Sequence, residues 1–239
     1  LLNSKKIESA VKNQDIIFHY GGLSGIYESM KNPIRTAEYN IIGTLKLLDL
    51  CVKYKIKKFI FASTLYVNSE QGGFYKSSKK AVEDFIEEYY KKYNLKFNIL
   101  RFGTVYGYRA SKENSINTII DLAIKKKIVF YKGNKKNIRE YINVRDAAKM
   151  AVKTINKKYI NQYLQITGNK KTSVINALKV IKKELGIKSE IIYSKNNKYE
   201  GHYIKTPDNF KFKKAKKIKL KKNISFKLGV REIIKNKLT

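Results

Sequence analysis

The sequence is poor in residues that bind metals or form disulfides. It contains one cysteine, Cys51, two histidines, two prolines and no tryptophan. A single thiol excludes an intramolecular disulfide and any multi-cysteine metal site. His19 and His202 lie far apart in the sequence without an acidic cluster, which argues against a metal site. We expect no metal, and we interpret His19, near the end of an apolar run, as a packed core histidine.

Long hydrophobic runs and targeting signals are missing as well. No apolar stretch approaches the ~20 residues that a membrane helix needs, and no secretory signal is present. We therefore expect a cytoplasmic protein that does not bind membranes. The sequence begins with Leu1 rather than methionine, which suggests a piece of a longer chain.

Acidic residues are scarce, with 19 against 52 basic ones, so the formal net charge is +33. This charge has two interpretations, a biased composition or an anionic partner. Lysine, isoleucine, asparagine and tyrosine are abundant together, which favours biased composition. Residues 209–239 carry 12 of the basic groups and one acid, Glu232. Within 211–222 the lysines are interleaved with apolar residues, which we interpret as the solvated face of a packed helix.

The apolar pattern predicts an α/β fold. Short buried strands are expected at 15–20, 58–62 and 97–102, and amphipathic helices at 37–52 and 75–93. On the second helix we expect Ala81, Phe85, Ile86 and Tyr89 to share one face. Strands that alternate with helices of this length predict βαβ units and a doubly wound, mainly parallel sheet.

The second half of the chain has a mixed pattern. We expect helices at 116–124, 145–155 and 173–185, and strands at 163–166 and 190–193. This predicts a dinucleotide-binding domain over residues 1–110. Residues 111–239 would form a small α+β substrate lobe, with elements returning to the first domain at about 140–168.

The candidate chemical motif is a tyrosine followed four residues later by a lysine. On a helix these side chains share one face, and the ammonium lowers the tyrosine pKa from about 10, so that the tyrosine can act as a base. Chance alone predicts about 3.5 such pairs from the 18 tyrosines and 46 lysines, and the chain has five. Their tyrosines are Tyr27, Tyr54, Tyr75, Tyr108 and Tyr131.

Context selects the pair Tyr75 and Lys79. It opens a predicted helix shortly after the strand at 58–62, which leads into Ser63 and Thr64. Open α/β sheets bind their ligands at the carboxyl ends of strands, where these hydroxyls would lie.

Several segments together resemble the extended short-chain dehydrogenase/reductases, in particular the nucleotide-sugar epimerase/dehydratase group that includes UDP-glucose 4-epimerase-like enzymes. They occur in that family's order and cover nearly the whole chain: FHYGG (18–22), NIIGT (40–44), KKFIFAST (57–64), YKSSK (75–79), ILRFGTVYG (99–107), REYINVRDAA (139–148) and ISFKLGVREII (224–234).

The resemblance implies specific roles for these residues. Thr64 would hydrogen-bond the reacting sugar oxygen, Tyr75 would remove and return its proton, and Lys79 would bind the nicotinamide ribose and tune Tyr75. The implied cofactor-binding residues are Gly21, Gly22, Asn40, Ser63, Tyr75, Lys79 and Phe102. The implied substrate-binding residues are Thr64, Thr104 and Arg139, the last as partner of a diphosphate.

The sequence also departs from the family pattern. The Gly-rich turn that holds a pyrophosphate is missing, and we expect it upstream of Leu1. NAD is the implied cofactor, and NADP stays open because the selecting residue would also lie upstream. Thr104 stands where the family often has asparagine. Thr64 is followed by Leu65 and Tyr66 rather than by the Asp-Glu pair of the family's dehydratases.

We therefore expect an NAD(P)-dependent nucleotide-sugar epimerase that transfers hydride at a sugar carbon, C4 by preference. A nucleotide-keto-sugar reductase, which would use Thr64, Tyr75 and Lys79 in the same way, is the nearest alternative. A non-catalytic basic protein that binds nucleic acid or a membrane surface is the alternative from another class. The expected partner is a nucleotide sugar and not nucleic acid, and a homodimer stays open.

Overall fold

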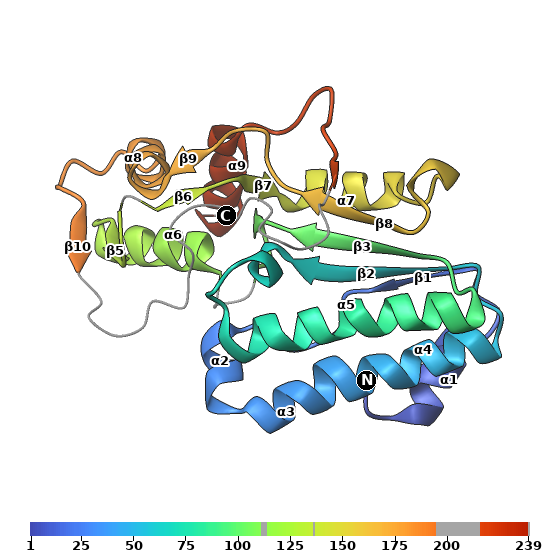
Figure 1. Cartoon of the computed structure of the whole chain (residues 1–239). Coiled ribbons are helices and arrows are strands. Elements are labelled where there is room, and N and C mark those ends of the chain that lie inside the picture. Colours follow the sequence, from blue (N-terminus) through green and yellow to red (C-terminus); the bar gives the residue numbers. More distant parts are fainter. Residues whose placement is uncertain (111–113, 136, 195–215, 239) are drawn as a thin grey trace. The chain divides into compact units, whose positions relative to one another are not determined.

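The computed structural model describes residues 1–110, 114–135, 137–194 and 216–238 (Figure 1). His202 and residues 211–215 of the basic stretch lie outside these ranges. The chain divides into two compact units. The sheet unit comprises Leu1–Phe102, Lys153–Gln165 and the described residues 216 and 217. The lobe unit comprises Gly103–Val152 and the described parts of Ile166–Thr206 and Ile218–Thr239.

The sheet unit is built on a parallel sheet, as the apolar runs predict. Among the described residues its strand order is β1-β2-β3-β8-β11, and β2 pairs in parallel with both β1 and β3. Phe59, Ile60 and Phe61 of β2 are fully buried, because β2 lies between two strands. The strands are β1 (Ile16–His19), β2 (Lys58–Thr64), β3 (Phe97–Phe102), β8 (Gln162–Ile166) and β11 (Lys216–Lys217).

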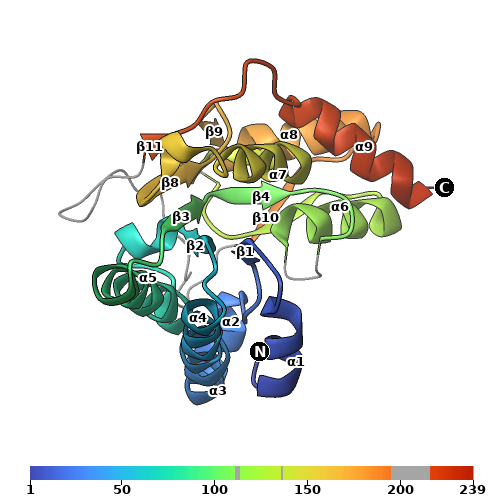
Figure 2. The ribbon, with the colours of Figure 1, turned by 90° about the vertical axis from the view of Figure 1, so that its right-hand side faces the viewer.

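Two long helices lie along one face of this sheet (Figures 1 and 2). They are α4 (Gly43–Lys53) and α5 (Gly73–Tyr93). Leu48 of α4 and Val82 and Ile86 of α5 are buried in one cluster with the β2 phenylalanines. The other helices of the unit are α1 (Ser4–Val11), α2 (Ile26–Lys31), α3 (Pro33–Ala37), the π turn η1 (Glu38–Ile42), and the 3-10 turns η2 (Leu65–Asn68) and η3 (Lys157–Tyr159).

The predicted face of α5 is partly wrong. Phe85 is 41% exposed, whereas Ser78, Lys79, Val82, Glu83 and Ile86 are the buried residues of this helix. A hydrophobic pattern treats Glu83 as a surface residue, yet it is buried because Arg101 of β3 pairs with it. The buried face of α5 therefore includes Glu83 and leaves Phe85 exposed.

The lobe unit is a mixed α/β body with its own core. Ile120, Leu178, Ile181 and Val230 are buried in that core. In the described part of the unit, short strands pair as β4 with β7, β5 with β10, and β6 with β9. Its elements are β4 (Thr104–Tyr106), α6 (Ser115–Lys126), β5 (Phe130–Lys132), β6 (Ile138–Arg139), β7 (Tyr141–Asn143), α7 (Val144–Lys153), β9 (Thr172–Ser173), α8 (Val174–Glu184), β10 (Ile192–Ser194) and α9 (Phe226–Leu238).

The basic stretch is not helical where the structure describes it. Lys216 and Lys217 form β11, which pairs in parallel with Leu164 and Gln165 of β8, and residues 218–222 are irregular. The predicted helix is wrong here because a sheet edge supplies backbone partners that the sequence pattern does not reveal.

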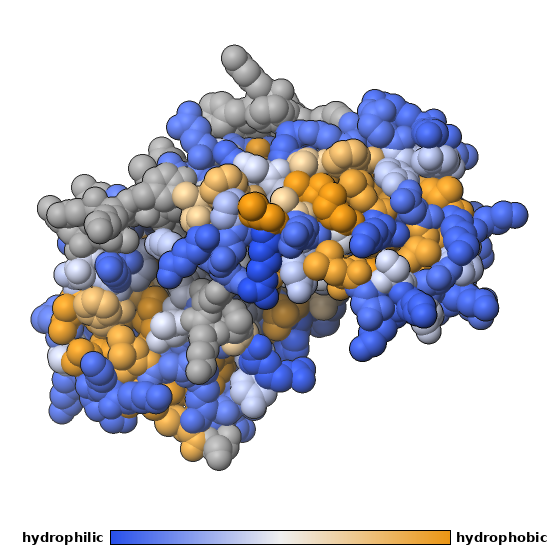
Figure 3. All heavy atoms as spheres, turned by 90° about the horizontal axis from the view of Figure 1, so that it is seen from below, coloured by the Kyte–Doolittle hydropathy of each residue, from blue (hydrophilic) through white to orange (hydrophobic). Residues whose placement is uncertain are grey.

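The surface alternates between hydrophilic areas and smaller hydrophobic patches (Figure 3). Exposed apolar side chains on the helical side of the sheet unit include Met30, Ile34, Ile42 and Phe85. Within the described ranges, no helix combines the length and the apolar character that crossing a bilayer requires.

Candidate active site

The carboxyl end of β2 is fastened to helix α5 by three consecutive residues. Lys79 Nζ donates to the Ala62 carbonyl at 2.9 Å, and Ser63 Oγ donates to Glu83 Oε1 at 2.5 Å. The side chain of Thr64 faces the Tyr75 hydroxyl closely enough to lower the pKa of that hydroxyl. Tyr75, Lys79 and Glu83 lie on successive turns of one helix face. Each of the three strand residues therefore contacts a different turn of α5.

Two glycines begin α5 and bring Tyr75 to the strand end. Gly72 and Gly73 have φ values of +102° and +51°, which residues with a side chain rarely adopt. A Cβ on Gly73 would lie 2.4 Å from Met30 Sδ. The Tyr75 amide donates to Ser29 Oγ at 3.1 Å, which ties the first turn of α5 to α2. This turn accommodates the short gap between Thr64 and Tyr75.

The Thr64 side chain makes two contacts in this arrangement. Besides its contact with Tyr75, its Oγ1 accepts a hydrogen bond from the Tyr66 amide at 3.3 Å and so caps the turn η2. The hydroxyl is therefore oriented by backbone and side chain together. It is buried at the end of β2, where a ligand of an open α/β sheet binds.

Burial changes the acidity of both members of the Tyr75–Lys79 pair. Desolvation raises the pKa of Tyr75 to about 12, and the hydrogen bond with Thr64 opposes that rise. Desolvation lowers the pKa of Lys79 to about 8, and the charge of Glu83 opposes that fall. Lys79 Nζ also lies 4.7 Å from the centroid of the Phe61 ring, a cation–π contact. Tyr75 is therefore protonated at neutral pH, and Lys79 is predominantly charged there. The predicted lowering of the Tyr75 pKa by Lys79 is wrong for the ligand-free protein, because the cost of burying the tyrosinate dominates.

Asn40 joins the loop after β1 to helix α5. Its Oδ1 accepts from the Leu23 amide at 2.7 Å, and its Nδ2 donates to the Leu23 carbonyl and to Ser78 Oγ, both at 2.9 Å. Asn40 lies in the π turn η1 between α3 and α4. Such turns insert an extra residue into a helix and often occur at functional sites. The sequence predicts an uninterrupted helix over 37–52, because helical periodicity does not reveal this insertion.

The residues at the end of β1 suit a dinucleotide. Gly22 has φ +136°, and a Cβ there would lie 2.6 Å from Asn40 Oδ1 and 3.9 Å from Lys79 Nζ. The missing Cβ thus makes room for the Asn40 amide, beside a buried ammonium. At the end of β3, the centroid of the Phe102 ring lies 6.0 Å from the centroid of the Tyr20 ring. The residues present therefore fit the cofactor that their sequence pattern implies.

His19 is a core residue, as its position predicts. It is 3% exposed, and its Nε2 lies 2.8 Å from Thr44 Oγ1. Burial and the charge of Lys79 lower its pKa to about 3, so the ring is neutral.

Thr104 and Arg139 belong to the lobe unit. Thr104 begins β4 and is partly buried, in register with Tyr141 of β7. Arg139 is 7% exposed, and its Nη1 donates to the Ile138 carbonyl at 3.0 Å. It is therefore a positioned side chain rather than a freely solvated one.

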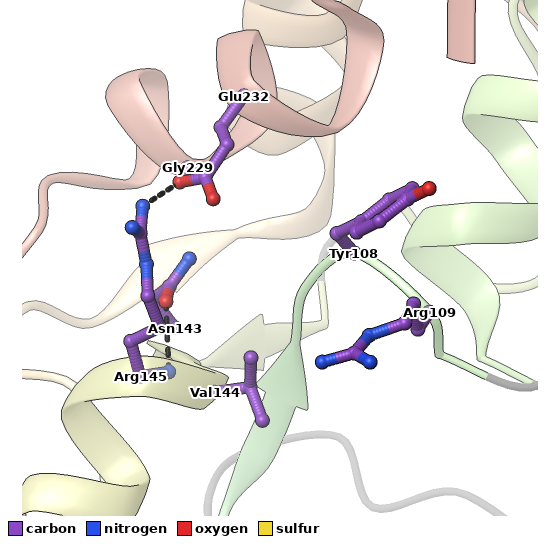
Figure 4. Close-up of a pocket in the computed structure, with 7 residues that line it drawn as sticks. All are labelled: Tyr108, Arg109, Asn143, Val144, Arg145, Gly229 and Glu232. Atoms are coloured by element: carbon purple, nitrogen blue, oxygen red, sulfur yellow. Dashed lines mark hydrogen bonds and ion pairs between the residues drawn. The ribbon is translucent and has the colours of Figure 1, made fainter. Parts of the chain in front are cut away.

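A separate pocket of about 120 Å³ lies within the lobe unit (Figure 4). Two of its lining residues, Arg145 and Glu232, form an ion pair. None of the predicted site residues lines it. Its lining residues are Tyr108, Arg109, Asn143, Val144, Arg145, Gly229 and Glu232.

The sequence interpretation missed two charged residues, Glu83 and Arg101. Both are completely or almost completely buried, and Arg101 Nη2 lies 2.6 Å from Glu83 Oε2. A signal existed in the arginine within the largely apolar run FNILRF, because a charge in a buried strand needs a partner.

The parallel sheet, the Tyr75–Lys79 pair and the hydroxyls at the end of β2 define an NAD-dependent α/β enzyme. Residues 1–164 match the NAD dependent epimerase/dehydratase family, and the chain belongs to this family. Membership confirms the predicted family, enzyme class and cofactor, NAD.

Several curated proteins are similar to the chain. A putative UDP-glucose 4-epimerase of Methanocaldococcus jannaschii is 28% identical, over 93% of this chain and 77% of that protein. A dTDP-D-glucose 4,6-dehydratase of Dictyostelium discoideum is 29% identical, over 61% of this chain and 40% of that protein. An uncharacterized UDP-glucose epimerase, YtcB of Bacillus subtilis, is 26% identical, over 79% and 64%. The chain thus spans about two fifths to about three quarters of these relatives.

Solved structures share the fold. A UDP-glucose 4-epimerase of Thermotoga maritima has a TM-score of 0.85 at 22% identity, over 100% of this chain and 83% of that one. A UDP-glucose 4-epimerase of Thermus thermophilus in complex with NAD has a TM-score of 0.81 at 19% identity, over 98% and 81%. These similarities confirm the predicted Rossmann-like α/β fold.

Proposed function

We propose that this chain supplies the catalytic residues of an NAD-dependent nucleotide-sugar epimerase that acts at C4 of the sugar. The observation that carries the proposal is the contact of β2 with α5, which brings the buried Thr64 and Lys79 and the partly buried Tyr75 together at the end of β2. The names of the relatives agree with this proposal, since UDP-glucose and UDP-glucuronate 4-epimerases are among them.

In the proposed reaction Thr64 holds the sugar hydroxyl and Tyr75 removes its proton. NAD, when bound, accepts a hydride from the sugar carbon and returns it. The ammonium of Lys79 favours the tyrosinate, which lowers the energy of the proton transfer. In the reverse step Tyr75 would give the proton back to the same sugar oxygen, which restores the phenolate for the next cycle.

The remaining site residues have proposed roles in binding either the cofactor or the substrate. We propose that Gly21, Gly22, Asn40, Ser63, Tyr75, Lys79 and Phe102 hold the cofactor, and that Thr64, Thr104 and Arg139 contact the substrate. Residues 1–110 would then form the cofactor domain. Residues 111–239 would form the substrate lobe, with returning elements at about 140–168.

Product analysis tests the proposal. The complete protein would be incubated with NAD and a panel of nucleotide hexoses, and the products would be analysed by mass and NMR. An epimerase gives unchanged mass with inverted C4. A second incubation would contain NADH and a nucleotide keto sugar. Unchanged hexoses in the first incubation, with a gain of two hydrogens on the keto sugar and consumption of NADH in the second, would replace the proposal with the reductase alternative.

For partners, we propose a nucleotide sugar and a second copy of the chain, with neither nucleic acid nor membrane as a ligand. Exposed apolar side chains on α3 and η1 (Ile34 and Ile42) support self-association. Sedimentation velocity tests the dimer. Binding to DNA and anionic vesicles at physiological salt tests the expected lack of these ligands.

A further inference from the structure

The buried ion pair between Glu83 and Arg101 is placed where stability alone explains it poorly. The two side chains are 0% and 1% exposed. Removing two ions from water is costly, and well-packed apolar residues often replace a buried pair without loss of stability. The position of the pair therefore needs an explanation beyond packing.

Both carboxylate oxygens of Glu83 accept hydrogen bonds, and the Arg101 guanidinium also contacts an aromatic ring. Glu83 Oε1 accepts from Arg101 Nε at 3.0 Å and from Ser63 Oγ at 2.5 Å, and Oε2 accepts from Arg101 Nη2 at 2.6 Å. The Arg101 guanidinium also lies 4.6 Å from the centroid of the Tyr163 ring. A planar guanidinium that contacts both carboxylate oxygens fixes orientation as well as charge.

These contacts hold the chain both before and after Thr64. Ser63, immediately before it, is held by Glu83, and Asn68, at the end of the turn η2 after it, accepts from Arg101 Nη1 at 3.3 Å. Arg101 thus restrains the chain on both sides of the hydroxyl that is proposed to hold the sugar.

The same carboxylate is the acid one helical turn beyond Lys79. Its charge raises the pKa of Lys79 against the effect of burial. Other titratable or charged groups around Lys79 are Tyr75 on α5, the neutral His19 on β1 and Arg101 on β3, which Glu83 neutralises. β2 contributes the Ala62 carbonyl and the Phe61 ring. Glu83 is therefore the acid that favours the ammonium form.

We propose that Glu83, held by Arg101, is a positioning residue that keeps Lys79 protonated and fixes the strand end that carries Thr64. The role in catalysis rests on the proposed function, whereas the effect on Lys79 belongs to the ligand-free protein. Arg101 orients the carboxylate, and Glu83 transmits that order to Ser63 and to the ammonium.

The test is a site-resolved titration of Lys79 in the complete protein without ligand. Competitive amine labelling at a series of pH values, read by mass spectrometry of the Lys79 peptide, gives its midpoint. Glu83→Gln keeps the shape but removes the charge, so the midpoint should fall by about one pH unit or more, as expected for loss of a neighbouring opposite charge. Asp84→Asn, on the exposed side of the same helix, is the matched control and should leave the midpoint unchanged.

Two further variants separate positioning from folding. Should Glu83→Gln fail to fold because Arg101 is left unpaired, the Glu83→Gln/Arg101→Met double variant removes both charges. Its Lys79 midpoint should still fall, but by less than in Glu83→Gln, because the positive charge of Arg101 is removed as well. Arg101→Lys keeps the charge but loses the planar contacts, so kcat should fall at least tenfold with the Lys79 midpoint near the wild-type value. An unchanged midpoint in the folded Glu83 variants overturns the inference. Failure of the proposed function is a different result, since the wild-type protein would then show no NAD-dependent turnover of nucleotide sugars.

Discussion

Asn40 Oδ1 lies 2.6 Å from the position that a Cβ on Gly22 would occupy. The same oxygen accepts the Leu23 amide, so it cannot move aside without breaking a buried hydrogen bond. The loop after β1 therefore has its conformation set jointly by a glycine and by the π turn that presents Asn40. This relationship links the glycine turn at the proposed cofactor edge to helix α5 through Ser78.

Gly22→Ala should destabilise the protein more than a glycine replacement elsewhere. The new side chain meets both an unfavourable φ of +136° and the Asn40 amide. Strain of this kind costs of order 1–3 kcal/mol, and overpacking costs a similar amount. Urea unfolding measures the change. Gly186→Ala is the matched control, because φ there is +64° and no atom lies within 4 Å of the added Cβ, so only the backbone term applies. Equal losses in the two variants would show that the Asn40 contact costs nothing.

The sheet could be predicted from the sequence because its central strands contain short, largely apolar runs. β2 and β3 contain FIFA and FNIL, and burial between neighbouring strands demands such runs. The selection of Tyr75 among five similar tyrosines rests on its order after a strand that ends in hydroxyls. The structure places Tyr75 beside Thr64.

Other features depend on contacts between distant residues. The buried charge of Glu83 requires Arg101, and the strand at 216–217 requires the edge of β8. The π turn at Asn40 is a local insertion that leaves the hydrophobic pattern nearly unchanged. Such features come from tertiary pairing, which propensity and periodicity do not encode.

Tyr75→Phe in the complete protein should reduce kcat by at least the ~10²–10⁴-fold typical of losing general acid–base help. The ring is retained, so packing and thermal stability should change little. Each of the other four motif tyrosines provides a control, since Tyr27 and Tyr108 are exposed and Tyr54 donates to Glu8 on α1. Phenylalanine at positions 27, 54, 108 and 131 should leave kcat near the wild-type value. Full activity of Tyr75→Phe would refute the assignment of the base.

The stability of the protein should fall as the pH falls from about 6.5 toward 3, partly because of His19. Burial lowers the folded-state pKa of His19 from 6.5 to about 3. Between these values the unfolded chain binds a proton that the folded chain does not, so acid favours unfolding, by up to about 1.4 kcal/mol per pH unit. His19→Gln removes this contribution and keeps a polar partner for Thr44. Urea unfolding at several pH values should therefore show a smaller slope for the variant, and an unchanged slope would mean that His19 titrates alike in both states.

The complete enzyme should not dehydrate nucleotide hexoses. Dehydration needs one group to take a proton from C5 and another to protonate the leaving hydroxyl on C6. After Thr64 the chain continues with Leu65, which is buried, and Tyr66, and both lie in the turn η2. The nearest downstream carboxylate is the exposed Glu70, beyond the end of that turn. The acid pair expected of a dehydratase is therefore replaced by one packed apolar residue and one phenol. Mass spectrometry of the products from a panel of nucleotide hexoses checks this, with unchanged mass expected for an epimerase. A product lighter by one water would contradict the prediction, and loss of that product in Glu70→Gln would then identify the acid.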